Sequence, residues 1–223
     1  MLVDAPGARL VDPRRRIRSV GRQPLLVPAL MHPTLLPRPF HHDGWVYEEK
    51  VDGYRMVVYK DDEGVRLVSR NGRDHTRRFP ELVKALGGLK PKSFMLDGEV
   101  AVFDKGLISR FEWLRAQPKD EPAIRPVYIA FDVLELAGRD LRDRPLKERR
   151  RVLERLVSNH SLTFAARRLA NDGLKAWQEA MARGYEGIVR KDPESRYVPG
   201  RTLKWLKVKQ PKYREQERGF YKP

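Results

Sequence analysis

The chain contains no cysteine among its 223 residues. Disulfides and cysteine-ligated zinc sites are therefore excluded, and a reducing cytoplasm is the simplest setting for the protein. A long apolar run is missing too, because prolines interrupt the stretch over residues 25–36, so we expect no membrane span and no signal peptide. The five histidines, at positions 32, 41, 42, 75 and 160, lack the spacing of metal ligands.

Acidic residues are scarce relative to basic ones. Lysine and arginine number 46 against 30 aspartate and glutamate, which gives a formal charge of +16 and a pI near 10.2. Such an excess is typical of proteins that bind a phosphate backbone, although ribosomal or membrane-surface association would leave a similar footprint. Residues 1–22 are rich in arginine and poor in apolar side chains, so we expect a basic segment that is mobile until it meets a polyanion.

Residues 23–209 are predicted to form one large domain, followed by a short tail over 210–223. Periodicity predicts strands at 45–49, 54–60 and 65–69, a hairpin turn at 61–64, and helices at 79–86, 145–157 and 174–182. The basic run from Lys147 to Arg151 is interpreted as a solvated helix face rather than a DNA contact. There is no internal repeat, and the mixture of elements indicates an α+β domain.

The hexapeptide from Lys50 to Arg55, Lys-Val-Asp-Gly-Tyr-Arg, predicts a nucleophilic lysine. An ordinary lysine amine is protonated near neutral pH, so a nucleophilic one must be desolvated or placed beside other cations such as Arg55. Gly53 permits a close backbone approach, and Asp52 can orient the lysine. A lysine at a strand edge beside a turn is the alternative interpretation, since short motifs recur by chance.

Four further segments follow in order, at residues 96–99, 128–132, 186–189 and 205–209. Together with Lys50 to Arg55 they resemble motifs I, III, IIIa, IV and V of the covalent nucleotidyltransferases. The sequence that connects these motifs, such as Ser69-Arg70-Asn71-Gly72, most resembles the adenylation domain of bacterial ATP-dependent DNA ligases of the end-joining type. The resemblance runs from about Pro28 to Lys209. It implies the DNA ligase and mRNA capping enzyme fold, which is ATP-grasp-like, with two antiparallel sheets and flanking helices around a nucleotide cleft.

Two glutamates are candidate metal ligands. Alternation over residues 94–103 places Asp97 and Glu99 on one strand face and apolar residues on the other, so Glu99 can face a site. Glu186 opens a strand after a helix that Gly184 ends. Carboxylate oxygens suit ribose hydroxyls or hydrated Mg²⁺. The resemblance implies that Glu99 and Glu186 contact both the nucleotide and Mg²⁺.

Strand parity places Lys207 and Lys209 on one face with Trp205. These two lysines would neutralise the α-phosphate, and we expect their charge to lower the pKa of Lys50. Phe131 lies in an apolar run, where it is either core or, as the resemblance implies, stacked on the adenine with about 1–3 kcal/mol of contact energy.

The resemblance also assigns Glu48 to the adenine amino group, although an exposed acid on a strand is the alternative. Arg55 and Arg70 are expected to bind phosphate or ribose through hydrogen bonds from their planar guanidinium groups. A lysine ammonium could not reproduce this planar geometry.

The implied activity is ATP-dependent DNA ligation. Lys50 takes AMP from ATP, AMP passes to a 5′-phosphate in nicked double-stranded DNA, and a 3′-hydroxyl then seals the strand during repair. We expect a nucleoid-associated monomer that acts with end-joining or other repair proteins. An RNA ligase or capping-type guanylyltransferase would share Lys50, Glu99 and Glu186, and a non-catalytic nick-binding accessory is the third alternative.

The 14 residues after Lys209 are too few for the oligonucleotide-binding barrel that follows in the family, which needs at least about 60 residues. That barrel supplies basic residues that align the pyrophosphate leaving group. Without them we expect self-adenylation to be slower by about a hundredfold or more, or to depend on a partner or on the basic tails, and we expect nicks that already carry AMP to be sealed more readily than ordinary nicks.

Overall fold

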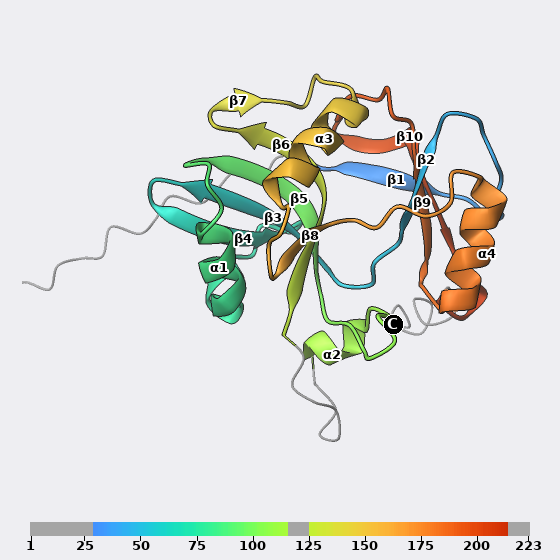
Figure 1. The fold of residues 1–223 in the computed structure, drawn as a ribbon, viewed down its shortest axis with the longest axis horizontal. Coiled ribbons are helices and arrows are strands. Elements are labelled where there is room, and N and C mark those ends of the chain that lie inside the picture. The colour runs from blue at the N-terminus through green and yellow to red at the C-terminus, as the bar shows by residue number, and fades with distance from the viewer. Residues whose placement is uncertain (1–28, 116–124, 214–223) are drawn as a thin grey trace, which may run out of the picture.

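The computed structural model describes residues 29–115 and 125–213. Two sheets make up the domain (Figure 1). The first, sheet A, has the order β1 (Met31–Leu35), β10 (Gly200–Lys209), β9 (Gly187–Lys191), β2 (Val46–Glu49). The second, sheet B, has the order β4 (Gly64–Ser69), β3 (Tyr54–Asp61), β5 (Phe94–Ala101), β6 (Val127–Leu136), β7 (Arg139–Asp140). A further strand of sheet B, β8 (Thr163–Ala165), pairs with β6. The predicted basic segment over 1–22 and most of the tail over 210–223 lie outside the described residues.

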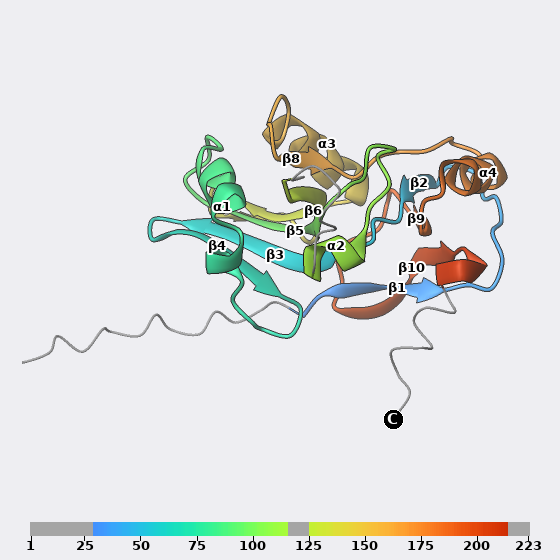
Figure 2. The same ribbon diagram turned by 90° about the horizontal axis from the view of Figure 1, so that it is seen from below.

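The prediction of two sheets is confirmed, but the sheets are not purely antiparallel. Strand β1 pairs with β10 in parallel, and β6 pairs with β8 in parallel. Parallel neighbours require a long connection between them, and almost the whole domain separates β1 from β10. Figure 2 shows these two strands side by side at one edge of the molecule.

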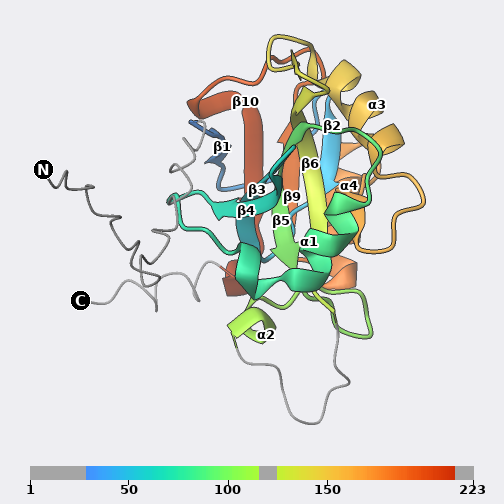
Figure 3. The ribbon, with the colours of Figure 1, turned by 90° about the vertical axis from the view of Figure 1, so that its left-hand side faces the viewer.

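The helices cover the outer sides of the sheets. Helices α1 (Pro80–Gly87) and α3 (Leu146–Leu156) pack on sheet B, α4 (Gly173–Arg183) packs on sheet A, and α2 (Phe111–Arg115) is a short helix of five residues (Figure 3). All three predicted helices are confirmed to within one residue at each end. Asp172 caps α4 by accepting from two backbone N–H groups at 2.9 Å, and Gly184 ends it at φ 73°. Among the described residues, no helix is long and apolar enough to cross a membrane.

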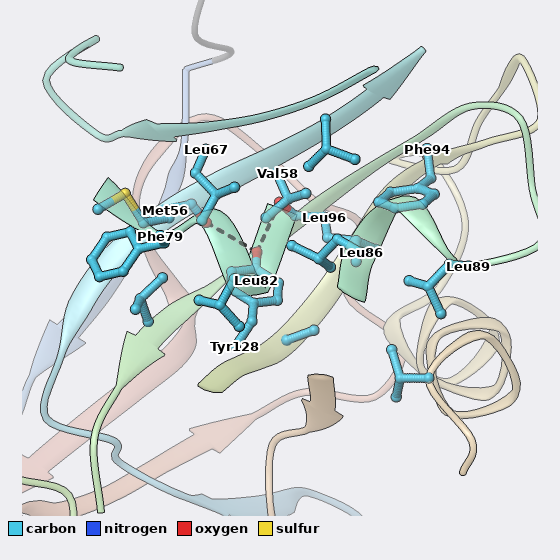
Figure 4. Packing of buried hydrophobic residues seen from close by; sticks show 14 of the residues in the cluster. Met56, Val58, Leu67, Phe79, Leu82, Leu86, Leu89, Phe94, Leu96 and Tyr128 are labelled. Carbon is cyan, nitrogen blue, oxygen red and sulfur yellow. Dashed lines mark hydrogen bonds between the residues drawn. The ribbon is translucent and has the colours of Figure 1, made fainter. Parts of the chain in front are cut away.

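The largest apolar core lies between α1 and strands β3, β4 and β5 (Figure 4). Leu96 and Val100 of β5 are fully buried in it. The Tyr128 hydroxyl donates to the backbone carbonyls of Met56 and Leu96, at 3.0 and 3.1 Å, and so ties three strands together. Because successive strand residues face opposite sides, this core turns Asp97 and Glu99 toward the other face of sheet B. The parity prediction for this strand is confirmed.

One prediction about α3 is wrong. Lys147 and Arg151 are exposed as expected, but Arg149 and Arg150 are only 0% and 4% exposed. The helical period places both arginines on the side of α3 that packs on the strands, beside the apolar Leu146. There they meet carboxylates from β6 and β2, so their charges are paired inside the protein.

Candidate active site

A buried glutamate holds the amine of Lys50. Lys50 directly follows β2, and its backbone N–H donates to the Gly187 carbonyl at 3.0 Å, which fixes it beside β9. Its Nζ lies 2.5 Å from Oε2 of Glu186, and the other oxygen, Oε1, lies 2.8 Å from Nζ of Lys209. Glu186 is 3% exposed. One carboxylate therefore joins two of the predicted site lysines.

The expected depression of the Lys50 pKa is wrong for this structure. Burial acts to lower the pKa, but the charges of Glu186, Glu99 and Asp52 outweigh it and raise the pKa above its ordinary value. The nearby acids therefore have a larger effect on this amine than the lysine pair has. Glu186 stands between Lys50 and Lys209, so it screens the like-charge repulsion on which the expectation depended.

Asp52 and Glu99 complete an acidic group around this lysine. Burial, reinforced by Glu186 and Asp52, raises the pKa of Glu99 to about 8, although Lys50 and Arg55 oppose the shift. Burial and Glu186 raise the pKa of Asp52 to about 6. The lysine amine donates the hydrogen bond that fixes it to Glu186, while Asp52 acts on the amine through charge. The orienting role predicted for Asp52 thus has a stronger candidate in Glu186.

The donor chemistry of Glu99 and Glu186 fits a hard divalent cation, which prefers carboxylate oxygens. Within the described residues, no three metal-ligating side chains gather closely enough to hold an ion by themselves. Mg²⁺ commonly binds through one or two carboxylates and keeps waters and substrate phosphates as its other ligands. These two glutamates could therefore hold Mg²⁺ together with a nucleotide.

The guanidinium group of Arg55 forms an ion pair with a buried aspartate. Its Nε and Nη2 donate to Oδ1 and Oδ2 of Asp97 at 3.0 and 2.7 Å. Asp97 is fully buried and also accepts from the Tyr197 hydroxyl at 2.7 Å. The Nη1 atom of Arg55, 3.2 Å from Nδ1 of His32, is the part of the guanidinium turned away from this pair. The predicted phosphate or ribose contact of Arg55 would have to use that atom.

Sequence reasoning missed Lys191, which lies at the centre of the region expected to hold the base. Its Nζ is 2.6 Å from Oε2 of Glu48, 5.1 Å from the ring centroid of Phe131 and 4.3 Å from that of Trp205. Phe131 is half-buried. Glu48 is 2% exposed, which excludes the alternative of an exposed acid. Lys191 lies two residues beyond the segment over 186–189, so the sequence pattern gave no signal of these contacts.

The remaining predicted residues lie on the two sheets. Lys207 is half-buried on β10, between Val189 of β9 and Leu35 of β1 in the strand register. Val208 packs on the α4 side of sheet A, while Trp205 belongs to the cluster that contacts Phe131, as parity predicts. Arg70 is exposed just after β4.

Two sheets that carry a half-buried lysine paired with a buried glutamate, together with a half-buried phenylalanine, are the arrangement expected of a nucleotidyltransferase domain. Residues 26–209 match the family model described as ATP dependent DNA ligase domain, and the chain belongs to this family.

Among curated proteins, it is 37% identical over 210 residues to the multifunctional non-homologous end joining protein LigD of Pseudomonas aeruginosa, which covers 92% of this chain and 24% of that protein. It is 38% identical over 166 residues to the LigD of Mycobacterium tuberculosis, with 74% and 21% covered. The solved structure of mycobacterial DNA ligase D complexed with ATP and MES matches with a TM-score of 0.70 and 35% identity, over 82% of this chain and 60% of that one. The chain thus spans about a quarter of the curated relatives or less.

Proposed function

We propose that this domain catalyses ATP-dependent DNA ligation with Lys50 as the nucleophile. The observation that carries the proposal is the contact of the Lys50 amine with Glu186, which Lys209 shares, in a domain of the ATP-dependent DNA ligase family. A nucleophilic lysine needs a proton acceptor nearby and cations beside the phosphate that it attacks. Glu186 can serve as the acceptor, and Lys209 and Lys207 as the cations.

In the first step the Lys50 nitrogen attacks the α-phosphorus of ATP. A P–N bond forms, the bond from the α-phosphorus to the bridging oxygen breaks, and pyrophosphate leaves with the electron pair. The ammonium of Lys50 loses one proton beforehand, and Oε2 of Glu186 at 2.5 Å is within reach to accept it. Phe131 would stack on the adenine. Mg²⁺ bound by Glu99 and Glu186 would supply positive charge to the phosphate oxygens.

In the second step a 5′-phosphate oxygen of the DNA attacks the phosphorus of the lysyl-AMP. The P–N bond breaks, Lys50 regains its proton, and the DNA end carries AMP through a new phosphoanhydride. A neighbouring 3′-hydroxyl then attacks the 5′-phosphate, loses its proton and expels AMP. Lys207, Lys209 and Arg70 are the proposed cationic contacts for the phosphates that exchange partners.

Nicked double-stranded DNA is the proposed substrate. The formal charge of +16 supports binding to a polyanion, and the relative from Pseudomonas aeruginosa is named for non-homologous end joining. We therefore propose a role in strand-break repair at the nucleoid, as a monomer or with end-joining proteins. Binding to the nick should weaken steeply as salt rises, because phosphate contacts release counterions.

Denaturing mass spectrometry after incubation with Mg²⁺ and either ATP or GTP tests the proposal. We expect a covalent AMP adduct with ATP and none in Lys50→Ala. Addition of nicked DNA to the purified adduct should then remove AMP from the protein and produce sealed product. A guanylate adduct formed in preference to AMP would indicate a capping-type enzyme, and the lack of any adduct would indicate a nick-binding accessory.

A further inference from the structure

Glu48 is held by two cations that come from different elements. Its Oε1 accepts from Nη1 of Arg150 in α3 at 2.9 Å, and its Oε2 lies 2.6 Å from Nζ of Lys191 in β9. All three side chains are 5% exposed or less. The other nitrogens of Arg150 are also bonded, Nε to Glu154 at 2.8 Å and Nη2 to the Ala166 carbonyl. The carboxylate of Glu48 therefore has a fixed orientation.

Stability alone gives little reason to keep such a cluster. Desolvation of buried charges offsets much of their attraction, and replacing a buried ion pair with apolar residues of similar volume is often neutral or stabilising. An apolar contact between α3 and β2 would serve packing equally well. A cluster that holds one carboxylate in a fixed orientation near the nucleophile therefore indicates a function for that carboxylate.

The residues around Glu48 indicate what this carboxylate does. Glu48 lies two residues before Lys50 on β2, and the ammonium of Lys191 that pairs with it also lies over the ring of Phe131 and contacts the Phe131 carbonyl at 3.4 Å. One cation thus links the carboxylate to the half-buried aromatic ring proposed to stack on the base. An ionised carboxylate only accepts hydrogen bonds, and each of its oxygens has a second lone pair to offer.

We propose that Arg150 and Lys191 are positioning residues that fix Glu48 as a hydrogen-bond acceptor and thereby make the site select adenine over guanine. This inference depends on the proposed function. Adenine carries an amino donor where guanine carries a carbonyl oxygen, so a fixed carboxylate attracts the first and repels the second. Without its two cations the buried carboxylate would lose the contacts that orient it, and it would then discriminate poorly.

The test measures covalent adduct formation with ATP and with GTP as functions of nucleotide concentration. Arg150→Met and Lys191→Met remove charge and keep much of the side-chain length. We expect the preference for ATP over GTP to fall by roughly ten- to hundredfold, the loss expected for one hydrogen bond to a charged group. The change should appear mainly as a higher KM for ATP rather than as a lower kcat.

Two neighbouring arginines in α3 supply matched controls. Arg151→Met removes an exposed charge from the same helix and should leave the nucleotide preference unchanged. Arg149→Met removes an equally buried arginine that pairs with Asp132 instead of Glu48, so it should lower stability without changing the preference. Arg150→Lys keeps a cation near Glu48 and should retain part of the preference, which provides a variant for measurement if Arg150→Met does not fold.

Glu48→Gln separates positioning from a merely structural effect. Its amide can donate to the guanine carbonyl, so GTP should be used more readily. Adding Arg150→Met to Glu48→Gln should then change the preference no further, because the two residues act through one group. A wild-type preference in the folded Arg150 and Lys191 variants, with adducts still forming, would overturn the inference. Absence of any adduct in the wild-type chain would instead refute the proposed function.

Discussion

Arg149→Met should be among the most destabilising single changes in this domain. Both Arg149 and Asp132 are 0% exposed, and two hydrogen bonds of 2.8 Å join the guanidinium to the carboxylate. Arg149 also donates to the carbonyls of Arg144 and Ser195, so it ties α3 to β6 and to the segment before β10. The variant leaves the Asp132 carboxylate buried without its strongest partner.

Removing one member of a buried ion pair costs about 3–5 kcal/mol. For a domain of this size, 1 kcal/mol corresponds to about 2–4 °C in Tm, so Tm should fall by about 6–20 °C. Urea unfolding followed by circular dichroism measures the free energy directly. Arg149→Met combined with Asp132→Leu should recover much of the loss, because neither partner then buries a lone charge.

The loss should depend on pH. Burial already raises the pKa of Asp132, and Arg149 opposes that shift, so the variant raises the pKa further. A carboxyl whose pKa is higher in the folded state destabilises the fold above that pKa and has no such effect below its unfolded pKa. The difference between wild type and Arg149→Met should therefore shrink between pH 8 and pH 4. A loss below 1 kcal/mol at pH 8, or one independent of pH, would refute the reasoning.

Three other changes have separable outcomes. Neither Lys50→Ala nor Lys50→Arg should form an AMP adduct in mass spectrometry, the second because guanidinium stays protonated; an adduct on either would require another nucleophile. Phe131→Leu should weaken ATP binding by about 1–3 kcal/mol in calorimetry with little change in Tm, whereas unchanged affinity would make Phe131 a core residue. Burial raises the pKa of Glu49 to about 7. The free energy of unfolding of Glu49→Gln should therefore exceed that of the wild type by about 1–3 kcal/mol at pH 8 and by very little at pH 4. Equal effects at both pH values would contradict this pKa shift.

Local patterns were sufficient to predict much of this fold. The predicted turn at residues 61–64 joins β3 and β4 as an antiparallel hairpin in which Asp61 faces Gly64. Helix α4 has both end signals in its sequence, a capping Asp172 and a terminating Gly184. Each of these features depends on residues only a few positions apart, and short-range chemistry determines it.

The parallel pairing of β1 with β10 had no comparable signal. Met31 lies opposite Gly200, and no property of either segment alone identifies the other as its neighbour. The buried arginines of α3, in contrast, do have a signal in the sequence. Asp132 stands inside an apolar strand, and an acid at such a position needs a buried partner, so a basic residue had to approach it from elsewhere in the fold.

For Lys50, the pKa expected from the sequence motif and the pKa indicated by the structure differ in direction. A motif predicts that a lysine attacks phosphate, but the resting structure pairs that lysine with Glu186 and raises its pKa. The two observations agree if the acids around Lys50 are occupied differently once substrate is bound. Cations that arrive with the nucleotide would compete for the oxygens of Glu186 and Glu99, and each oxygen withdrawn from the ammonium would remove a charge that stabilises its proton. The nucleophile would then become available only when there is a phosphate to attack.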